Sequence, residues 1–171
     1  KRSEELRQQL KELKELKEKK FNEMVANRTD PTQEGWDAAW NEYYDKYGRQ
    51  FAEDIRVLER AIHTEMNREI DVGDGVTMYL YSDAYACTVI AKTAKTITVQ
   101  RDKATLDPNF KPEFIPGGFA AHCTNQNEQS YTYERDTNGE ITKCYWSEKM
   151  GRYTTGGDQS IKIGLGRHEF Y

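Results

Sequence analysis

The sequence predicts an α+β protein: an N-terminal long helical hairpin or coiled-coil arm followed by a small antiparallel, SH3-like β-barrel or bent sheet. Two observations predict this class. Apolar and aromatic residues recur every three or four positions through the first 70 residues, which is the helical period. From Val72 onward the period changes to two, as in strands with one buried face. We therefore expect a helical arm over residues 1–70 and an antiparallel β domain over residues 71–171.

The first helix is predicted over residues 3–26. Ser3 precedes two glutamates, and a serine suits a helix N-cap because its side-chain oxygen accepts a free backbone N–H. Leu6, Leu10 and Leu13 recur at helical spacing among Lys, Glu and Gln residues, which favour helix. Because the apolar stripe is narrow, this helix must pack on a partner, either within the chain or in a second copy.

The second helix is predicted over residues 31–69, with Asp30 as its cap and Pro31 at its first position. Its apolar stripe keeps its phase across Gly48, where we expect a kink inside a continuous helix. About 38 residues make a helix of about 57 Å, so the first helix covers only part of it. A homodimer would cover the rest, and the candidate dimer or partner interface consists of Trp40, Tyr47, Phe51, Ile55, Leu58, Ile62 and Met66.

Six or seven short strands are predicted in the β domain, where apolar and polar residues alternate between turn signals. Asn138-Gly139 is the strongest hairpin signal in the chain. The proline-rich stretch 103–127 is expected to be an irregular excursion without a strand pair. The expected strands are 76–81, 85–91, 96–100, 129–135, 141–146, 152–155 and 160–163.

Composition restricts the function classes. The formal net charge of −4 argues against a general polyanion binder, which is usually strongly basic. Three widely spaced cysteines without a CxxC pair indicate reduced thiols in a cytoplasmic protein. The charged N-terminus argues against a signal peptide, and the apolar runs are far shorter than the roughly 20 residues that span a bilayer. We expect a soluble protein with no membrane association.

No motif indicates catalysis, and we expect a protein that is not an enzyme and has no metal or cofactor. His122-Cys123 lacks the second close ligand pair of a zinc site. Gly156-Gly157 and the glycines at 164 and 166 match neither a P-loop nor a dinucleotide-binding loop. Nor is there a nucleophile elbow.

A basic–aromatic surface on the β domain is the second candidate site. Aromatic rings interleaved with arginines could stack bases and contact phosphates, as small barrels do. The alternative is that the tyrosines belong to an aromatic-rich core. Acidic residues on the second helix are interspersed with arginines, which favours a salt-bridged, solvated face there. The candidate ligand or partner surface consists of Arg101, Lys103, Tyr131, Tyr133, Arg152 and Arg167.

Residues 73–105, GDGVTMYLYSDAYACTVIAKTAKTITVQRDKAT, resemble the β module of small accessory proteins encoded by phages and prophages, and the closing GRHEFY fits the same pattern. Together with the helical N-terminal half, the chain resembles phage type II-A anti-CRISPR proteins. The resemblance implies inhibition of a type II CRISPR effector nuclease, loaded with guide RNA, by direct binding in the host cytoplasm. The alternatives are a protein that sequesters a nucleotide signal and a phage factor with direct nucleic-acid contact.

Overall fold

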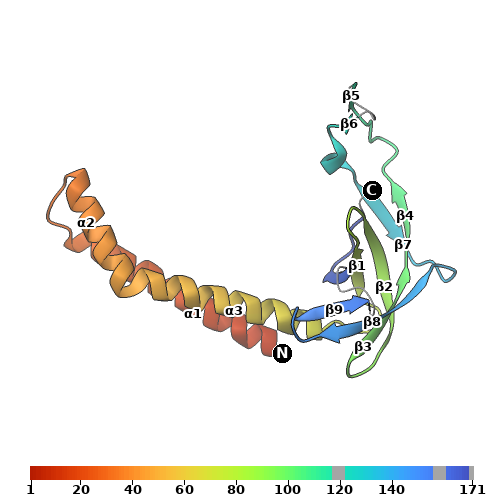
Figure 1. Ribbon diagram of the computed structural model, residues 1–171, viewed down its shortest axis with the longest axis horizontal. Coiled ribbons are helices and arrows are strands. Elements are labelled where there is room, and N and C mark those ends of the chain that lie inside the picture. The colour runs from red at the N-terminus through yellow and green to blue at the C-terminus, as the bar shows by residue number, and fades with distance from the viewer. Residues whose placement is uncertain (117–121, 156–160, 170–171) are drawn as a thin grey trace. The chain divides into compact units, whose positions relative to one another are not determined.

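The computed structural model describes residues 1–116, 122–155 and 161–169. It contains two compact units, Lys1–Met66 and Asn67–Tyr171, which are considered one at a time. The first unit is a helical arm, and the second contains a closed antiparallel barrel of six strands (Figure 1). The predicted α+β class, with an N-terminal helical arm followed by a small barrel, is therefore confirmed.

The arm is an antiparallel helical hairpin. Its first helix is α1 (Arg2–Asn27), and its second comprises α2 (Gln33–Tyr43), a π-helical segment η1 (Tyr44–Gly48) and α3 (Arg49–Arg68). The hairpin buries apolar side chains from both of its helices: Leu6, Tyr43, Phe51 and Ile62. Lys14 and Glu59 connect α1 to α3 with an ion pair of 3.5 Å. The stripe thus packs largely within one chain.

The helix starts differ from the expected ones. Ser3 lies inside α1 and is buried, and Lys1 is the N-cap. In the second helix Thr32, not Asp30, is the N-cap: its hydroxyl accepts the backbone N–H of Gly35 at 3.1 Å. The Asp30 carboxylate instead accepts the Thr32 backbone N–H and hydroxyl, at 2.9 and 2.7 Å. Because Asp30 binds Thr32 and Thr32 caps the helix, the second helix begins two residues later than expected.

Gly48 lies inside a continuous helix, as expected, at the end of the π-helical turn. Figure 1 shows the helix changing direction between α2 and α3. Gly48 is buried, and a Cβ there would lie 3.1 Å from a Tyr44 ring atom and 3.2 Å from a Tyr43 ring atom. A glycine is therefore what lets the two tyrosine rings approach the backbone at this turn.

The barrel has the strand order β1-β10-β9-β8-β3-β2, and every neighbouring pair is antiparallel. Its interior is filled by small and β-branched side chains, which suit a pleated, buried face. The strands are β1 (Gly75–Tyr79), β2 (Ala84–Lys92), β3 (Thr96–Arg101), β8 (Ile141–Ser147), β9 (Arg152–Thr155) and β10 (Lys162–Leu165). The core consists of Ile70, Val76, Cys87, Val89, Ile97, Val99, Cys144, Tyr153 and Ile163.

Between β3 and β8 the chain forms two further ladders, so the prediction of an irregular excursion over residues 103–127 is wrong. β4 (Lys103–Leu106) pairs with β7 (Tyr131–Glu134), and β5 (Phe114–Ile115) pairs with β6 (His122–Cys123), with a 3-10 turn η2 (Gln126–Glu128) before β7. The prolines end these strands early but do not prevent them from pairing.

Two further strand predictions need correction. Asn138-Gly139 does form a turn, in which the Gly139 N–H donates to the Asp136 carbonyl at 3.0 Å. The flanking strands do not form a hairpin, because β7 pairs with β4 and β8 pairs with β3. The first strand ends at Tyr79, since the Leu80 N–H already closes a turn. The expected strand at 160–163 begins outside the described residues, and β10 runs from Lys162.

Candidate binding surface on the helical arm

An aromatic cluster joins the two helices of the arm. Phe21 of α1 meets Trp36, Trp40 and Tyr43 of α2 edge-on, with ring centroids 6.4, 6.0 and 5.9 Å apart. Tyr43 continues the cluster to Tyr47 in η1, at 6.3 Å. Each such ring pair contributes about 0.5–1.5 kcal/mol beyond the area it buries. The cluster therefore fixes the hairpin without a second copy of the chain.

Part of this cluster remains open to solvent. The side chains of Trp40, Tyr44 and Tyr47 are 42%, 40% and 40% exposed. Single exposed aromatic residues are common, but several that lie within one or two helical turns form a patch of the kind that is typical of interaction surfaces. Of the candidate interface residues, Trp40 and Tyr47 thus belong to an open face. Phe51 and Ile62 are buried in the hairpin, and Ile55, Leu58 and Met66 are half-buried.

Tyr44 was not among the candidate interface residues, because it falls outside the stripe of the 3.6-residue period. The π-helical turn contains an extra residue, which changes which side chains face the hairpin. Adjacent tyrosines at 43 and 44 were the available signal. Because neighbouring residues of a helix point in different directions, the burial of Tyr43 leaves Tyr44 facing solvent.

Cations from the arm lie over several of these rings. Such contacts contribute about 0.5–1 kcal/mol at exposed sites. They are Lys20 over Tyr47 at 5.1 Å, Arg28 over Trp36 at 4.7 Å and Arg49 over Tyr44 at 5.3 Å. The aromatic face is therefore a surface that already accommodates guanidinium and ammonium groups.

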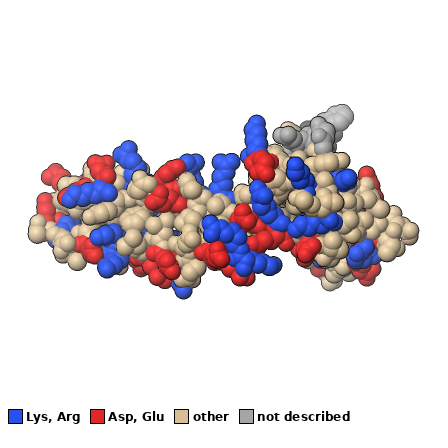
Figure 2. Space-filling model, turned by 90° about the horizontal axis from the view of Figure 1, so that it is seen from below, with Lys and Arg blue, Asp and Glu red and all other residues tan. Residues whose placement is uncertain are grey.

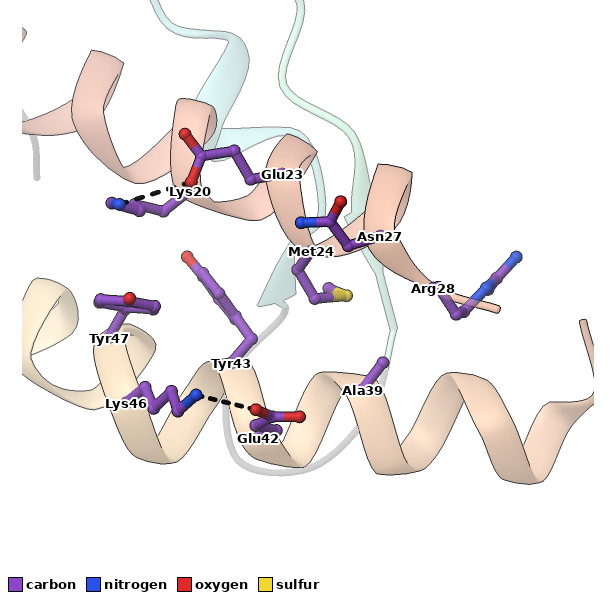
Figure 3. A pocket seen from close by; sticks show the side chains of 10 residues that line it. All are labelled: Lys20, Glu23, Met24, Asn27, Arg28, Ala39, Glu42, Tyr43, Lys46 and Tyr47. Carbon is purple, nitrogen blue, oxygen red and sulfur yellow. Dashed lines mark hydrogen bonds and ion pairs between the residues drawn. The ribbon is translucent and has the colours of Figure 1, made fainter. Parts of the chain in front are cut away.

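A groove of about 240 Å³ opens between α1 and the second helix, and Figure 3 shows Met24 and Tyr43 pointing into the space between them. Its rims carry two ion pairs, Lys20–Glu23 at 3.4 Å and Lys46–Glu42 at 2.9 Å. The hydrogen bond and charge of Lys46 lower the pKa of Glu42. The groove is smaller than the roughly 300–1,000 Å³ of typical ligand pockets, so it suits a side chain of a partner better than a cofactor.

Opposite charges are interspersed over the arm. Figure 2 shows blue and red side chains mixed along the visible face of the helices. Glu53 and Arg56 form a pair of 2.8 Å, and Asp45 and Arg49 form one of 3.3 Å. The flank of the second helix is therefore the salt-bridged face that the sequence favoured.

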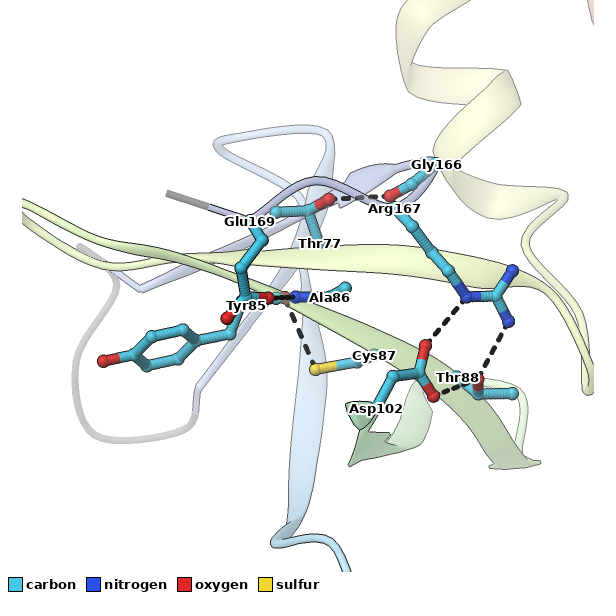
Figure 4. Close-up of polar contacts among 9 residues, drawn as sticks. All are labelled: Thr77, Tyr85, Ala86, Cys87, Thr88, Asp102, Gly166, Arg167 and Glu169. Atoms are coloured by element: carbon cyan, nitrogen blue, oxygen red, sulfur yellow. Dashed lines mark hydrogen bonds and ion pairs between the residues drawn. The ribbon is translucent and has the colours of Figure 1, made fainter. Parts of the chain in front are cut away.

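On the β domain, two arginines of the candidate surface, Arg101 and Arg167, hold the C-terminal segment to the barrel, and Figure 4 shows the contacts of Arg167. Arg101 pairs with Glu169 at 3.0 Å and lies 3.7 Å from the centroid of the Tyr85 ring. Arg167 donates to Asp102 at 2.7 Å and to Thr88. The Asp102 and Glu169 side chains are almost fully buried. Neither acid was predicted, since no local pattern marks a carboxylate that pairs across the sequence.

The other residues of that candidate surface do not form one open patch. Arg152 is half-buried and donates to the Ile163 carbonyl at 3.0 and 3.1 Å. Tyr131 is half-buried and Lys103 is exposed. Burial raises the pKa of Tyr131 and of Tyr133. Most of these side chains therefore stabilise the fold.

Thiol chemistry is suppressed in the barrel core. Burial raises the pKa of Cys87 to about 12 and that of Cys144 to about 11. A thiolate is the nucleophilic form, so these thiols are inert at neutral pH. In the described part of the chain, no group of three His, Cys, Asp or Glu side chains is arranged to hold a metal ion.

Among the described residues, none of the helices combines the length and the apolar character that crossing a bilayer requires. Comparison of the chain with protein-family models, with curated protein sequences and with solved structures gives no match. The open aromatic face of the arm is thus the strongest candidate site that the geometry offers.

Proposed function

We propose that the protein is a phage anti-defence protein that inhibits a type II CRISPR effector nuclease by stoichiometric protein binding, without enzymatic activity, in the host cytoplasm. The nuclease as target, loaded with its guide RNA, comes from the sequence resemblance. The observation that supports binding as the mode of action is the open aromatic face, Trp40, Tyr44 and Tyr47, on a hairpin that packs within one chain.

This face has the composition of a protein interface. Trp, Tyr and Arg are the residues that most often dominate binding energy when they are covered by a partner. The cluster around Phe21 holds the helices together before binding, so little conformational freedom is lost on association. Inhibition would then follow from occupying a surface that the nuclease needs for target DNA binding or cleavage.

The alternatives receive less support from the same contacts. A nucleotide or nucleic-acid site on the barrel would use Arg101, Arg152 and Arg167. All three donate to carboxylates or carbonyls of the protein itself. Phosphate groups would have to displace those partners.

The homodimer remains a prediction. Phe51 and Ile62, which were expected to need a second copy, are already buried within the single chain. A dimer would therefore have to form through the exposed rings, in competition with a nuclease. Light scattering at micromolar concentration would distinguish a monomer from a dimer.

The direct test mixes purified protein with guide-loaded type II nuclease and measures complex formation by size-exclusion chromatography and target cleavage by gel assay. We expect a stable complex and loss of cleavage at near-equimolar inhibitor. Unchanged cleavage at a tenfold excess, without a complex, would refute the proposal. Loss of cleavage at an inhibitor-to-nuclease ratio far below one would instead indicate that the protein acts as an enzyme.

A further inference from the structure

Trp40 differs from its aromatic neighbours. The rings of Trp36, Tyr44 and Tyr47 each have a Lys or Arg side chain of the same arm over them in a cation–π contact. Within the described ranges, no Lys or Arg lies over Trp40, whose ring contacts are with Phe21 and Tyr43. Trp40 is 42% exposed, and the indole ring binds cations best among the aromatic side chains.

The surrounding charge also favours a cation. Residues 30–45 contain no Lys or Arg, and Asp37, Trp40 and Tyr44 follow at helical spacings that place them on one side of α2 and η1. The Asp37 carboxylate accepts a neutral side-chain N–H from Gln33 at 2.9 Å, which leaves its charge unbalanced by that contact. Of the acidic residues of this stretch, Glu42 and Asp45 are paired with Lys46 and Arg49 just beyond it, whereas Glu34 and Asp37 form no ion pair within the described ranges.

We propose that the Trp40 face, formed by Asp37, Trp40 and Tyr44, binds an arginine or lysine side chain presented by a basic segment of a partner protein. This inference rests on the proposed function and names its contact. Arg49, whose guanidinium carbon lies 5.3 Å from the Tyr44 ring centroid and which also pairs with Asp45, is an example within the arm of a cation on this face. RNA-guided nucleases line their nucleic-acid channels with positive charge, so such a segment is available on the proposed target.

Two other occupants fit the charges less well. Nucleic-acid phosphates would be repelled by the carboxylates of Glu34 and Asp37, which are not balanced by an ion pair in the described part of the arm. A second copy in a two-fold dimer would bring the same acidic stretch against itself. Charge complementarity therefore selects a basic protein segment.

The first experiment uses a synthetic peptide as a stand-in for that segment. The acetylated peptide Ser-Arg-Ser-Arg-Ser is titrated into the full chain labelled with ¹⁵N, and the indole N–H signal of Trp40 is followed by NMR after assignment with Trp40→Phe. We expect a saturable shift that a Ser-Glu-Ser-Glu-Ser peptide does not produce. Asp37→Asn should raise the peptide Kd about 2- to 5-fold, as for an exposed charge pair. No saturable shift, or a larger one with single-stranded DNA, would overturn the inference.

The second experiment measures affinity for guide-loaded nuclease. Trp40→Leu should weaken binding about 5- to 30-fold, the range for a cation–π contact that is desolvated. Tyr81→Leu is the matched control, because Tyr81 is a fully exposed aromatic residue of the β domain. Equal binding by wild type and Trp40→Leu would overturn this inference and leave the proposed function standing. If the peptide shifts the Trp40 signal but the protein does not bind the nuclease, the proposed function is refuted and the cation site at Trp40 stands.

Discussion

Removal of the Asp102 carboxylate tests whether the polar network of the C-terminal segment stabilises the barrel. Asp102 accepts the Arg167 Nε–H at 2.7 Å and the Thr88 hydroxyl at 2.7 Å. Its side chain is 2% exposed, whereas that of Arg167 is 34% exposed. In Asp102→Ala both donors lose a buried acceptor.

The magnitude follows from the difference in exposure between the two partners. Breaking a fully buried ion pair costs about 3–5 kcal/mol, because the remaining charge stays without water. Because Arg167 can regain water, the loss is smaller than the sum for two hydrogen bonds to a charged group, each of which contributes about 1.5–3 kcal/mol. We expect Asp102→Ala to lower the free energy of unfolding of the barrel by about 2–4 kcal/mol. Asp102→Asn should lose less, because its amide oxygen still accepts one bond.

The assay is urea unfolding followed by Trp146 fluorescence in a Trp36→Phe, Trp40→Phe background, so that the signal reports the β domain alone. The matched control is Glu148→Ala, which removes an exposed partner of Arg68 and should change stability by less than about 1 kcal/mol. A loss below about 0.5 kcal/mol in Asp102→Ala, with an unchanged urea dependence, would show that the network does not stabilise the fold.

Three further predictions concern the arm and the thiols. Phe21→Ala should destabilise the arm by about 2–4 kcal/mol, because it removes the ring that joins both helices. Thr32→Ala should cost about 1 kcal/mol through loss of the N-cap bond to Gly35. At pH 8 an aromatic disulfide that reacts with thiolates should modify Cys123 but not Cys87 or Cys144 of the barrel core. The raised pKa values of these two buried thiols leave almost no thiolate at that pH.

Each of these predictions has an internal comparison. Leu16→Ala and Thr29→Ala alter exposed neighbours in the arm and should leave its melting temperature nearly unchanged. Circular dichroism at 222 nm follows the helices in all four variants. A Phe21→Ala arm as stable as Leu16→Ala would contradict the role of the aromatic cluster. Labelling of three thiols in the folded protein would contradict the burial of the core cysteines.

Local patterns predicted the elements that depend on local physics. The 3.6-residue spacing predicted both helices, and alternation placed most barrel strands within a few residues. Pairing was harder to predict, since β4 joins β7 across a long insertion. The Asn138-Gly139 turn suggested a hairpin because turn chemistry is local, whereas the partners of β7 and β8 are decided by the rest of the sheet.

The candidate sites show the same division. The aromatic stripe was visible in the sequence, but which rings are buried depends on α1 and on the π-helical turn. Arg101 and Arg167 look like free cations in the sequence because Glu169 and Asp102, their partners, are far from them along the chain. A basic–aromatic pattern therefore identified residues that fasten the barrel.

The π-helical turn contributes Tyr44 and Tyr47 to the open aromatic face, whereas Trp40 precedes the turn in α2. In an unbroken α-helix the side chains three and four positions apart share one face, so the stripe from Trp36 onward would turn toward α1. The extra residue in η1 delays the rotation of the chain by about one position. Tyr43 is buried against Phe21, and Tyr44, the next residue, faces solvent because neighbouring residues of a helix do not share a face. Since Gly48 is what permits the Tyr43 and Tyr44 rings to lie against the turn, the glycine that suggested a kink also helps to place Tyr44 on the surface where binding is proposed.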